Sequence, residues 1–191
     1  MDMTLYHGND FSEDVKFSGH NGPLNDQGKD IKCIGYHLLN EYGCTHKYKI
    51  PPSTLETLLG HLEIGYHRQA PPHCLNNLIN LIHRRNGNPY HNNLHASDVL
   101  QTTHWLIGQT GIKDWLSDLE IFALLLSAII HDYDHSGTTN NFHVQSTSNL
   151  AILYNDKSVL ENHHVAAFFK TMLDNDCFIL ANMSQADFRE L

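Results

Sequence analysis

Residues 117–132 read SDLEIFALLLSAIIHD and decide the fold of this chain. Ser117 and Glu120 have the spacing of a capping box, in which two side chains bind backbone N–H groups at a helix start. The stretch from Ile121 to Ile130 contains a single polar residue, so a helix formed by it has no polar face. We therefore predict a helix that ends near residue 131, lies at the centre of the molecule and must be covered by other helices on every side.

Further helices are predicted on both sides of this segment. Two of them open with capping-box pairs, Ser53 with Glu56 and Ser158 with Glu161. No alternating run of β-branched residues competes with them, so we predict an all-α fold packed around the apolar helix. The expected flanking helices cover about residues 31–43, 53–62, 75–82, 92–111 and 158–174.

Composition limits the kind of protein this is. The 191 residues suit one domain and carry a formal net charge of −9, from 12 Lys and Arg against 21 Asp and Glu. This balance argues against nucleic acid as a partner, because phosphate binding depends on Lys and Arg. No basic stripe of the kind that binds anionic lipid is present either. The 16 histidines are far more than usual, and histidine is the commonest metal ligand.

The sequence also predicts a cytoplasmic protein without a membrane segment. Its four cysteines lie far apart with no C-x-x-C pair, which suits a reducing compartment. Residues 1–10 lack the apolar core of a signal peptide, and the apolar run 121–130 is about half as long as a membrane helix. Residues 1–30 are polar, so we expect a mobile tail followed by one domain over residues 31–191.

Two segments carry residue types that bind divalent metals. His91 and His95 lie four residues apart and share one face if a helix has begun there, although two surface histidines are the alternative. His131 and Asp132 follow the apolar helix, with His135 one turn further along. Imidazole beside a carboxylate is a recurring ligand pair for divalent metals. The alternative is a polar helix end, where histidine complements the helix dipole.

A third segment, YNDKSVLENHH at 154–164, contains Glu161, whose alternative role is the capping box. Together with NPYHNNLHASDV at 88–99 and HDYDHSG at 131–137, it resembles the catalytic domain of class I 3′,5′-cyclic nucleotide phosphodiesterases. The order and the intervals of the motifs match as well. TTNNFHVQ at 138–145 and KIP at 49–51 are most similar to the calcium/calmodulin-dependent subfamily.

The resemblance implies a helical bundle of the HD-domain metal-dependent phosphohydrolase type. It implies hydrolysis of 3′,5′-cyclic nucleotides (cAMP, cGMP or both) to nucleoside 5′-monophosphates in second-messenger signalling. It also implies two divalent metals, expected to be Zn²⁺ and Mg²⁺, which lower the pKa of a shared water and spread the charge on the phosphoryl oxygens.

The resemblance further implies roles for individual residues. His95, His131 and Asp132 would bind the zinc, and Asp132 would also reach the magnesium. The remaining residues would handle water and substrate: His135 and Glu161 orient water, His91 is the general acid, and Tyr90 lines the pocket near the phosphate.

The chain departs from the family pattern in two places. It ends at Leu191, about halfway through the family's domain, so we expect a bundle that is incomplete at its C-terminus and lacks a fourth, aspartate ligand. Asp174, Asp176 and Asp187 do not sit in the matching motif. We expect an insertion at about residues 69–85, interpreted either as a surface loop with a short helix or as an artefact of the gene model or of splicing.

The expected partner is the cyclic nucleotide substrate. The resemblance to the calcium/calmodulin-dependent subfamily implies calmodulin as a partner. However, residues 1–29 contain only two lysines and no basic amphipathic stripe that would bind it. The alternative for this chain is a catalytically inactive, truncated product that binds metal weakly or associates with a full-length partner.

Overall fold

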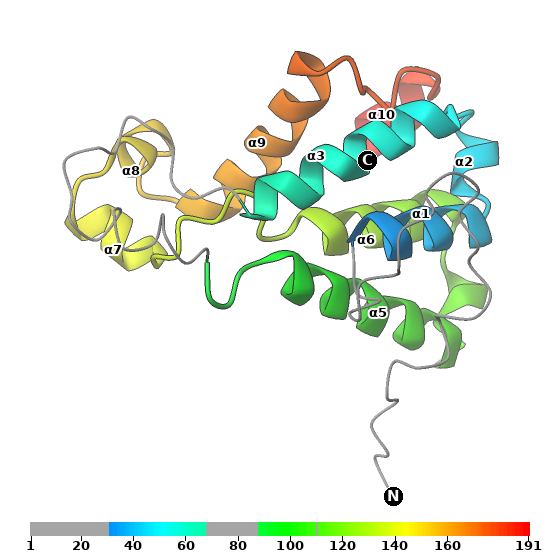
Figure 1. Ribbon diagram of the computed structural model, residues 1–191, viewed down its shortest axis with the longest axis horizontal. Helices are drawn as coiled ribbons and strands as arrows, with labels where there is room; N and C mark the ends of the chain where they lie inside the picture. The colour runs from blue at the N-terminus through cyan, green and yellow to red at the C-terminus, as the bar shows by residue number, and fades with distance from the viewer. Residues whose placement is uncertain (1–30, 68–87, 110) are drawn as a thin grey trace, which may run out of the picture.

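The computed structural model describes residues 31–67, 88–109 and 111–191, and every regular element in these ranges is a helix (Figure 1). The all-α prediction is confirmed. The expected tail at 1–30, the helix at 75–82 and the insertion at 69–85 lie outside the described residues. Within the described ranges, no helix has both the length and the apolar character needed to cross a membrane. In chain order the helices are α1 (Ile31–Glu41), α2 (Cys44–Lys47), α3 (Pro52–His67), α5 (Asn93–Gln109), the 3₁₀ helix η2 (Ile112–Trp115), α6 (Asp118–Ile130), α7 (Asn140–Gln145), α8 (Asn149–Leu153), α9 (Val159–Asp174) and α10 (Gln185–Glu190).

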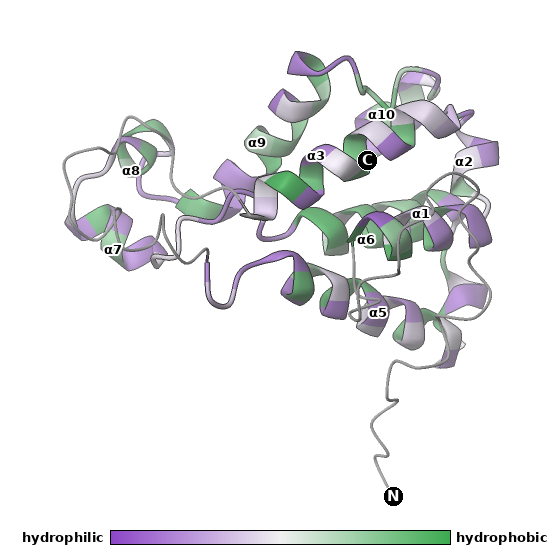
Figure 2. Ribbon diagram, viewed as in Figure 1, coloured by the Kyte–Doolittle hydropathy of each residue, from purple (hydrophilic) through white to green (hydrophobic). Residues whose placement is uncertain are grey.

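Helix α6 is the centre of the core, as the sequence predicts. It packs against α1, α5 and α9, and Figure 2 shows its hydrophobic residues among these helices. Phe122, Leu125 and Ile129 are fully buried. The predicted capping box at its start is confirmed: the Glu120 N–H donates to Ser117 Oγ at 3.3 Å, and the Ser117 N–H donates to Glu120 Oε2 at 2.8 Å.

One strip of α6 is not covered by the other described helices. Leu124 is 41% exposed and Ser127 is exposed as well. Helices α1, α5 and α9 pack on other sides of α6, so among the described residues this strip faces outward.

The other two predicted capping boxes are not formed. Helix α3 begins at Pro52, which is suited to the first helical position because it has no N–H to satisfy, so Ser53 already lies inside the helix. Ser158 has a left-handed φ of 42° and its side chain makes no capping bond. The α9 N-terminus is capped from α7 instead, because Asn140 Oδ1 accepts the Leu160 N–H at 2.8 Å.

Helices α7 and α8 lie apart from the bundle of α1, α3, α5 and α6 (Figure 1). A buried histidine, His143, ties this region together. Its Nε2 lies 3.0 Å from Ser136 Oγ and 2.9 Å from Thr138 Oγ1, and its Nδ1 lies 2.9 Å from Ser148 Oγ. These contacts join the turn after α6 to α7 and to the start of α8.

Candidate metal centre

His131 and Asp132 project from the turn that ends α6. The chain leaves the helix because the Tyr133 N–H donates to Ile130 O at 2.9 Å and Asp134 adopts a left-handed φ of 57°. His131 Nδ1 donates to Ala128 O at 3.0 Å, since a carbonyl can only accept. In the neutral ring this leaves the lone pair on Nε2, the nitrogen that faces the other site residues.

His95 brings a third ligand atom from α5. Asn92 begins this helix, and its Oδ1 accepts the Leu94 N–H at 3.0 Å and the His95 N–H at 3.2 Å. His95 Nε2 lies 3.2 Å from His131 Nε2 and 3.3 Å from Asp132 Oδ2, and His131 Nε2 lies 3.1 Å from the same oxygen. The structure therefore brings together three residues that the sequence singled out.

The charges of these three groups respond to one another. Burial acts to raise the pKa of Asp132, but the hydrogen bond and the charge of His131 outweigh it and lower the pKa to about 2. For His131, burial acts to lower the pKa, whereas the bonds to Asp132 and Ala128 raise it, and the net shift is upward. Burial and the neighbouring His131 lower the pKa of His95. The site thus favours the carboxylate form of Asp132 and the uncharged form of His95.

The three atoms fit the ligand set of a zinc ion. Two ligand atoms, each about 2.1 Å from a tetrahedral zinc, lie about 3.4 Å from each other. The three separations observed here, 3.1 to 3.3 Å, are close to that value. Two imidazole nitrogens and one carboxylate oxygen are also a donor combination found at zinc sites.

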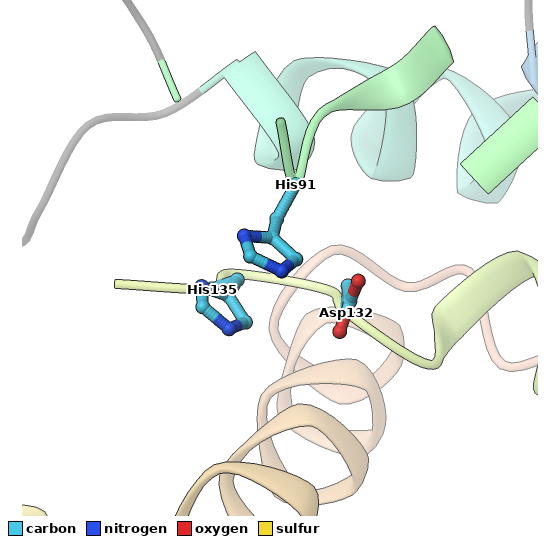
Figure 3. Close-up of side chains that lie close together, drawn as sticks. All are labelled: His91, Asp132 and His135. Atoms are coloured by element: carbon cyan, nitrogen blue, oxygen red, sulfur yellow. The ribbon is translucent and has the colours of Figure 1, made fainter. Parts of the chain in front are cut away.

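A second group lies beside the first and shares Asp132 with it. Figure 3 shows His91 over His135, with Asp132 next to both. The His91 and His135 rings stack with centroids 3.8 Å apart. Asn88 links the two, because its Oδ1 accepts the His91 N–H at 3.2 Å and its Nδ2 donates to His135 O at 3.3 Å.

His135 is neutral and has a defined tautomer. Burial and the nearby His91 lower its pKa to about 4. Its Nδ1 accepts the Gly137 N–H at 2.9 Å, so the ring proton is on Nε2.

The two remaining predicted residues lie at the edge of the site. Tyr90 is 60% exposed, and its ring centroid is 4.6 Å from that of His95 and 4.9 Å from that of His91. Glu161 is exposed. Among the described residues it belongs to neither of the two groups of possible metal ligands that share Asp132. Asn140 Nδ2 donates to both of its carboxylate oxygens, at 3.1 and 3.0 Å, and this bonding lowers the pKa of Glu161.

Sequence reasoning missed His164. This buried residue of α9 donates from Nδ1 to Tyr133 O at 2.7 Å, and its Nε2 lies 3.9 Å from Asp132 Oδ1. Its ring stacks on that of His135 at 5.4 Å. The available signal was its place in an otherwise apolar stripe with Leu160 and Phe168, where an imidazole must find polar partners.

Comparisons with known proteins agree with the motifs. The sequence profile of the family described as 3′5′-cyclic nucleotide phosphodiesterase matches residues 90–191. A calcium/calmodulin-dependent 3′,5′-cyclic nucleotide phosphodiesterase 1 of dual specificity from Drosophila melanogaster is 49% identical over 164 residues, covering 86% of this chain and 18% of the relative. The corresponding 1C protein of Mus musculus is 46% identical over 170 residues, covering 87% of this chain and 22% of the relative.

Solved structures agree in fold. The phosphodiesterase domain of a RhoPDE fusion protein from Salpingoeca rosetta superposes with a TM-score of 0.70 at 31% identity, covering 87% of this chain and 46% of that domain. The chain thus spans about a fifth of the curated relatives and under half of the solved domain. The predicted resemblance, including the likeness to the calcium/calmodulin-dependent subfamily, is confirmed. From its sequence and its fold together, this chain belongs to the 3′,5′-cyclic nucleotide phosphodiesterase family.

Proposed function

We propose that this chain supplies part of an active site that hydrolyses 3′,5′-cyclic nucleotides with bound divalent metal. The observation that carries the proposal is the convergence of His95 Nε2, His131 Nε2 and Asp132 Oδ2. In the reaction, the oxygen of a water joins phosphorus, the bond from phosphorus to O3′ breaks, and O3′ takes a proton. The product is a nucleoside 5′-monophosphate.

His95, His131 and Asp132 are the residues that would hold zinc, and Asp132, which also belongs to the second group, would face magnesium. When bound, such cations act as Lewis acids toward phosphoryl oxygen and lower the pKa of water. The chain's own contribution is orientation. The bond from His131 Nδ1 to Ala128 O keeps the Nε2 lone pair directed at the site.

His91 is the proposed general acid toward O3′. Its backbone N–H is held by Asn88, and its ring is fixed against the ring of His135. It precedes α5, and its ring centroid lies 6.0 Å from that of the proposed ligand His95, so its proton can be delivered next to the metal centre. General acid catalysis of this kind contributes about 10² to 10⁴ in rate.

His135 and Glu161 are proposed to orient water. With its Nδ1 occupied by the Gly137 N–H, His135 offers an Nε2–H that can donate to a water oxygen. Glu161 is an acceptor held in one orientation by Asn140. Tyr90 stands beside the rings of His91 and His95, where it would line the phosphate end of the pocket.

The relatives' names guide the choice of substrate and partner. They are called dual specificity and calcium/calmodulin-dependent, so we propose both cAMP and cGMP as substrates. Calmodulin remains a proposed partner of the protein by family alone.

The test is metal dependence with product identification. The chain is stripped by exhaustive chelation, zinc and magnesium are restored, and the conversion of cAMP and cGMP to 5′-monophosphates is followed together with zinc content. We expect turnover only after metal is restored, and loss of bound zinc in His131→Ala. His46→Ala is the matched control, because His46 is an exposed histidine outside the site. Full activity after chelation would contradict the proposal.

A second candidate concerns these 191 residues taken alone. They span 46% of the solved phosphodiesterase domain, which favours weak metal binding without turnover, or association with a longer partner. The same experiment separates the two candidates, since zinc bound through His131 without any 5′-monophosphate would support the second.

A further inference from the structure

The hydroxyl of Tyr66 bridges two backbone groups at the end of α6. It donates to Ile129 O at 2.8 Å and accepts the Asp132 N–H at 3.4 Å. Tyr66 belongs to α3 and its side chain is 3% exposed. Burial raises its pKa, so the hydroxyl keeps its proton and remains a donor to Ile129 O.

This bridge forms at the C-terminus of α6, where the helical hydrogen-bond pattern ends. In a continuing helix, the Tyr133 N–H would donate to Ile129 O, but here it donates to Ile130 O. Ile129 O is one of the carbonyls that a helix end leaves without a helical partner, and the Tyr66 hydroxyl takes that place. A side chain from α3 therefore defines how α6 ends and where Asp132 begins its turn.

The last turn of α3 packs directly against this turn. A Cβ added at Gly65 would lie 2.2 Å from Tyr133 Cε2, so the backbone there is in direct contact with the Tyr133 ring. The Tyr66 and Tyr133 rings also meet edge to face at 5.7 Å. Tyr133 is in turn held by Thr171 of α9, whose Oγ1 lies 3.0 Å from the Tyr133 hydroxyl. Ile129, before Asp132 in the chain, is thus contacted by α3, and Tyr133, after it, is contacted by both α3 and α9.

We propose that Tyr66 is a positioning residue for Asp132. It acts through the backbone N–H of Asp132 and the carbonyl three residues before it. This inference rests on the proposed function, because the position of Asp132 matters for metal binding only if Asp132 is a metal ligand. Removing an outer partner of a metal ligand commonly lowers metal affinity by about 10- to 100-fold.

The test compares Tyr66→Phe with Tyr48→Phe. Both tyrosines are 3% exposed, but the Tyr48 hydroxyl has no hydrogen-bond partner among the described residues. Zinc affinity of the 191-residue chain is measured by competition with a chromophoric chelator, and ligand geometry by the visible absorption of bound Co²⁺. We expect zinc affinity to fall about tenfold in Tyr66→Phe with an altered Co²⁺ spectrum. Tyr48→Phe should keep both values.

Two further measurements separate positioning from general loss of stability. Leu62→Ala, a fully buried change on the same helix, should lower the melting temperature while leaving the Co²⁺ spectrum unchanged. In the metal-free chain, amide exchange at Asp132 should become about fivefold faster in Tyr66→Phe and stay unchanged in Tyr48→Phe.

Each outcome decides one of the two proposals. If zinc binds the parent and Tyr66→Phe equally, or if Leu62→Ala alters the Co²⁺ spectrum as much, Tyr66 does not position Asp132. If the parent binds no zinc, the proposed metal site fails, and the amide exchange of Asp132 alone decides the inference. Unchanged exchange in Tyr66→Phe would then overturn it.

Discussion

At three histidines of the site, a hydrogen bond to the main chain determines which ring nitrogen carries the proton. Ala128 O binds His131 Nδ1, Tyr133 O binds His164 Nδ1, and the Gly137 N–H binds His135 Nδ1. The first two contacts place the ring proton on Nδ1 and the third places it on Nε2. The free Nε2 of His131 therefore has a lone pair that can bind a metal, whereas the Nε2–H of His135 can donate to water.

Asp132 should be the residue whose loss costs most. We expect Asp132→Ala to lower cyclic nucleotide turnover by more than His135→Ala or Glu161→Ala, because Asp132 belongs to both metal-type groups. Changes at residues outside the ligand set typically cost about 10- to 100-fold. Turnover and zinc content are measured for all three variants under saturating metal. Equal, small losses at the three positions would show that the assignment of roles is wrong.

The metal-free chain should lose stability as the solution is acidified. His135 has a pKa of about 4 in the folded chain against about 6.5 when unfolded, so the unfolded chain takes up the proton first. Its contribution to stability is therefore complete above about pH 6.5 and is lost as the pH falls toward about 4. Asp132, with a folded pKa of about 2, adds a further loss from about pH 4 downward.

Urea unfolding at a series of pH values checks this prediction. The fall in the free energy of unfolding between about pH 6.5 and about pH 4 should be shallower in His135→Gln than in the parent. The control is His46→Gln, which changes an exposed histidine away from the site. A parent and a His135→Gln variant with the same slope would contradict the role assigned to burial at this ring.

Helix starts are the elements in which local and distant contacts compete. Ser117 and Glu120 form their capping box, whereas Ser53 is displaced into α3 by Pro52 and Ser158 gives up its role to Asn140 of another helix. The same sequence signature therefore has one outcome where nothing else satisfies the N–H groups and another where a neighbouring element does.

Serine-to-alanine changes at two of these boxes test the difference. Ser117→Ala should lower the free energy of unfolding by about 1 kcal/mol, because it removes a formed cap. Ser53→Ala should change it by less than about 0.5 kcal/mol, because Ser53 lies within the helix, where alanine is favoured. Chemical denaturation of the two variants and the parent measures both values. A larger loss from Ser53→Ala than from Ser117→Ala would mean that the α3 start has been misassigned.

Asn140 joins α7 to α9 and should contribute more to stability than the adjacent Asn141. Asn140→Ala removes the acceptor for the Leu160 N–H and both bonds to the Glu161 carboxylate, so we expect a loss of about 1 to 2 kcal/mol of stability. Asn141→Ala, at the next and exposed position of α7, is the matched control. Denaturation curves that cannot distinguish the two variants would count against the bridge from α7 to α9.

At the scale of the whole molecule, the surface carries several large apolar side chains. Trp115 is 88% exposed, and Leu124 is exposed on the central helix. The uncovered part of α6 favours association, because a helix without a polar face exposes apolar surface wherever it is not covered.

We therefore expect the 191-residue chain to self-associate. Sedimentation velocity over a range of concentrations should show a mass that rises with concentration, and Leu124→Lys should shift the distribution toward the monomer. A chain that stays monomeric at every concentration tested would contradict the prediction and would mean that these side chains are tolerated singly.

The all-α class, the central helix with its Ser117 cap and the three motifs that identify the family could be predicted from the sequence. These features are local: caps and helical periodicity act over three or four residues, and a motif is a run of neighbours. The motifs also named the three residues that meet at the candidate metal centre, His95, His131 and Asp132.

How those residues are held depends on contacts between distant parts of the chain, which the sequence does not show. The contact of Tyr66 with Asp132 joins residues 66 positions apart, and the cap of α9 by Asn140 joins residues 20 apart. Neither pair shares a helix or a period, so no local pattern marks it. Such contacts form where two elements meet at a helix end, α3 at the end of α6 and α7 at the start of α9. Packing there keeps water from backbone groups that the helix leaves without partners, and a side chain from the neighbouring element must satisfy them.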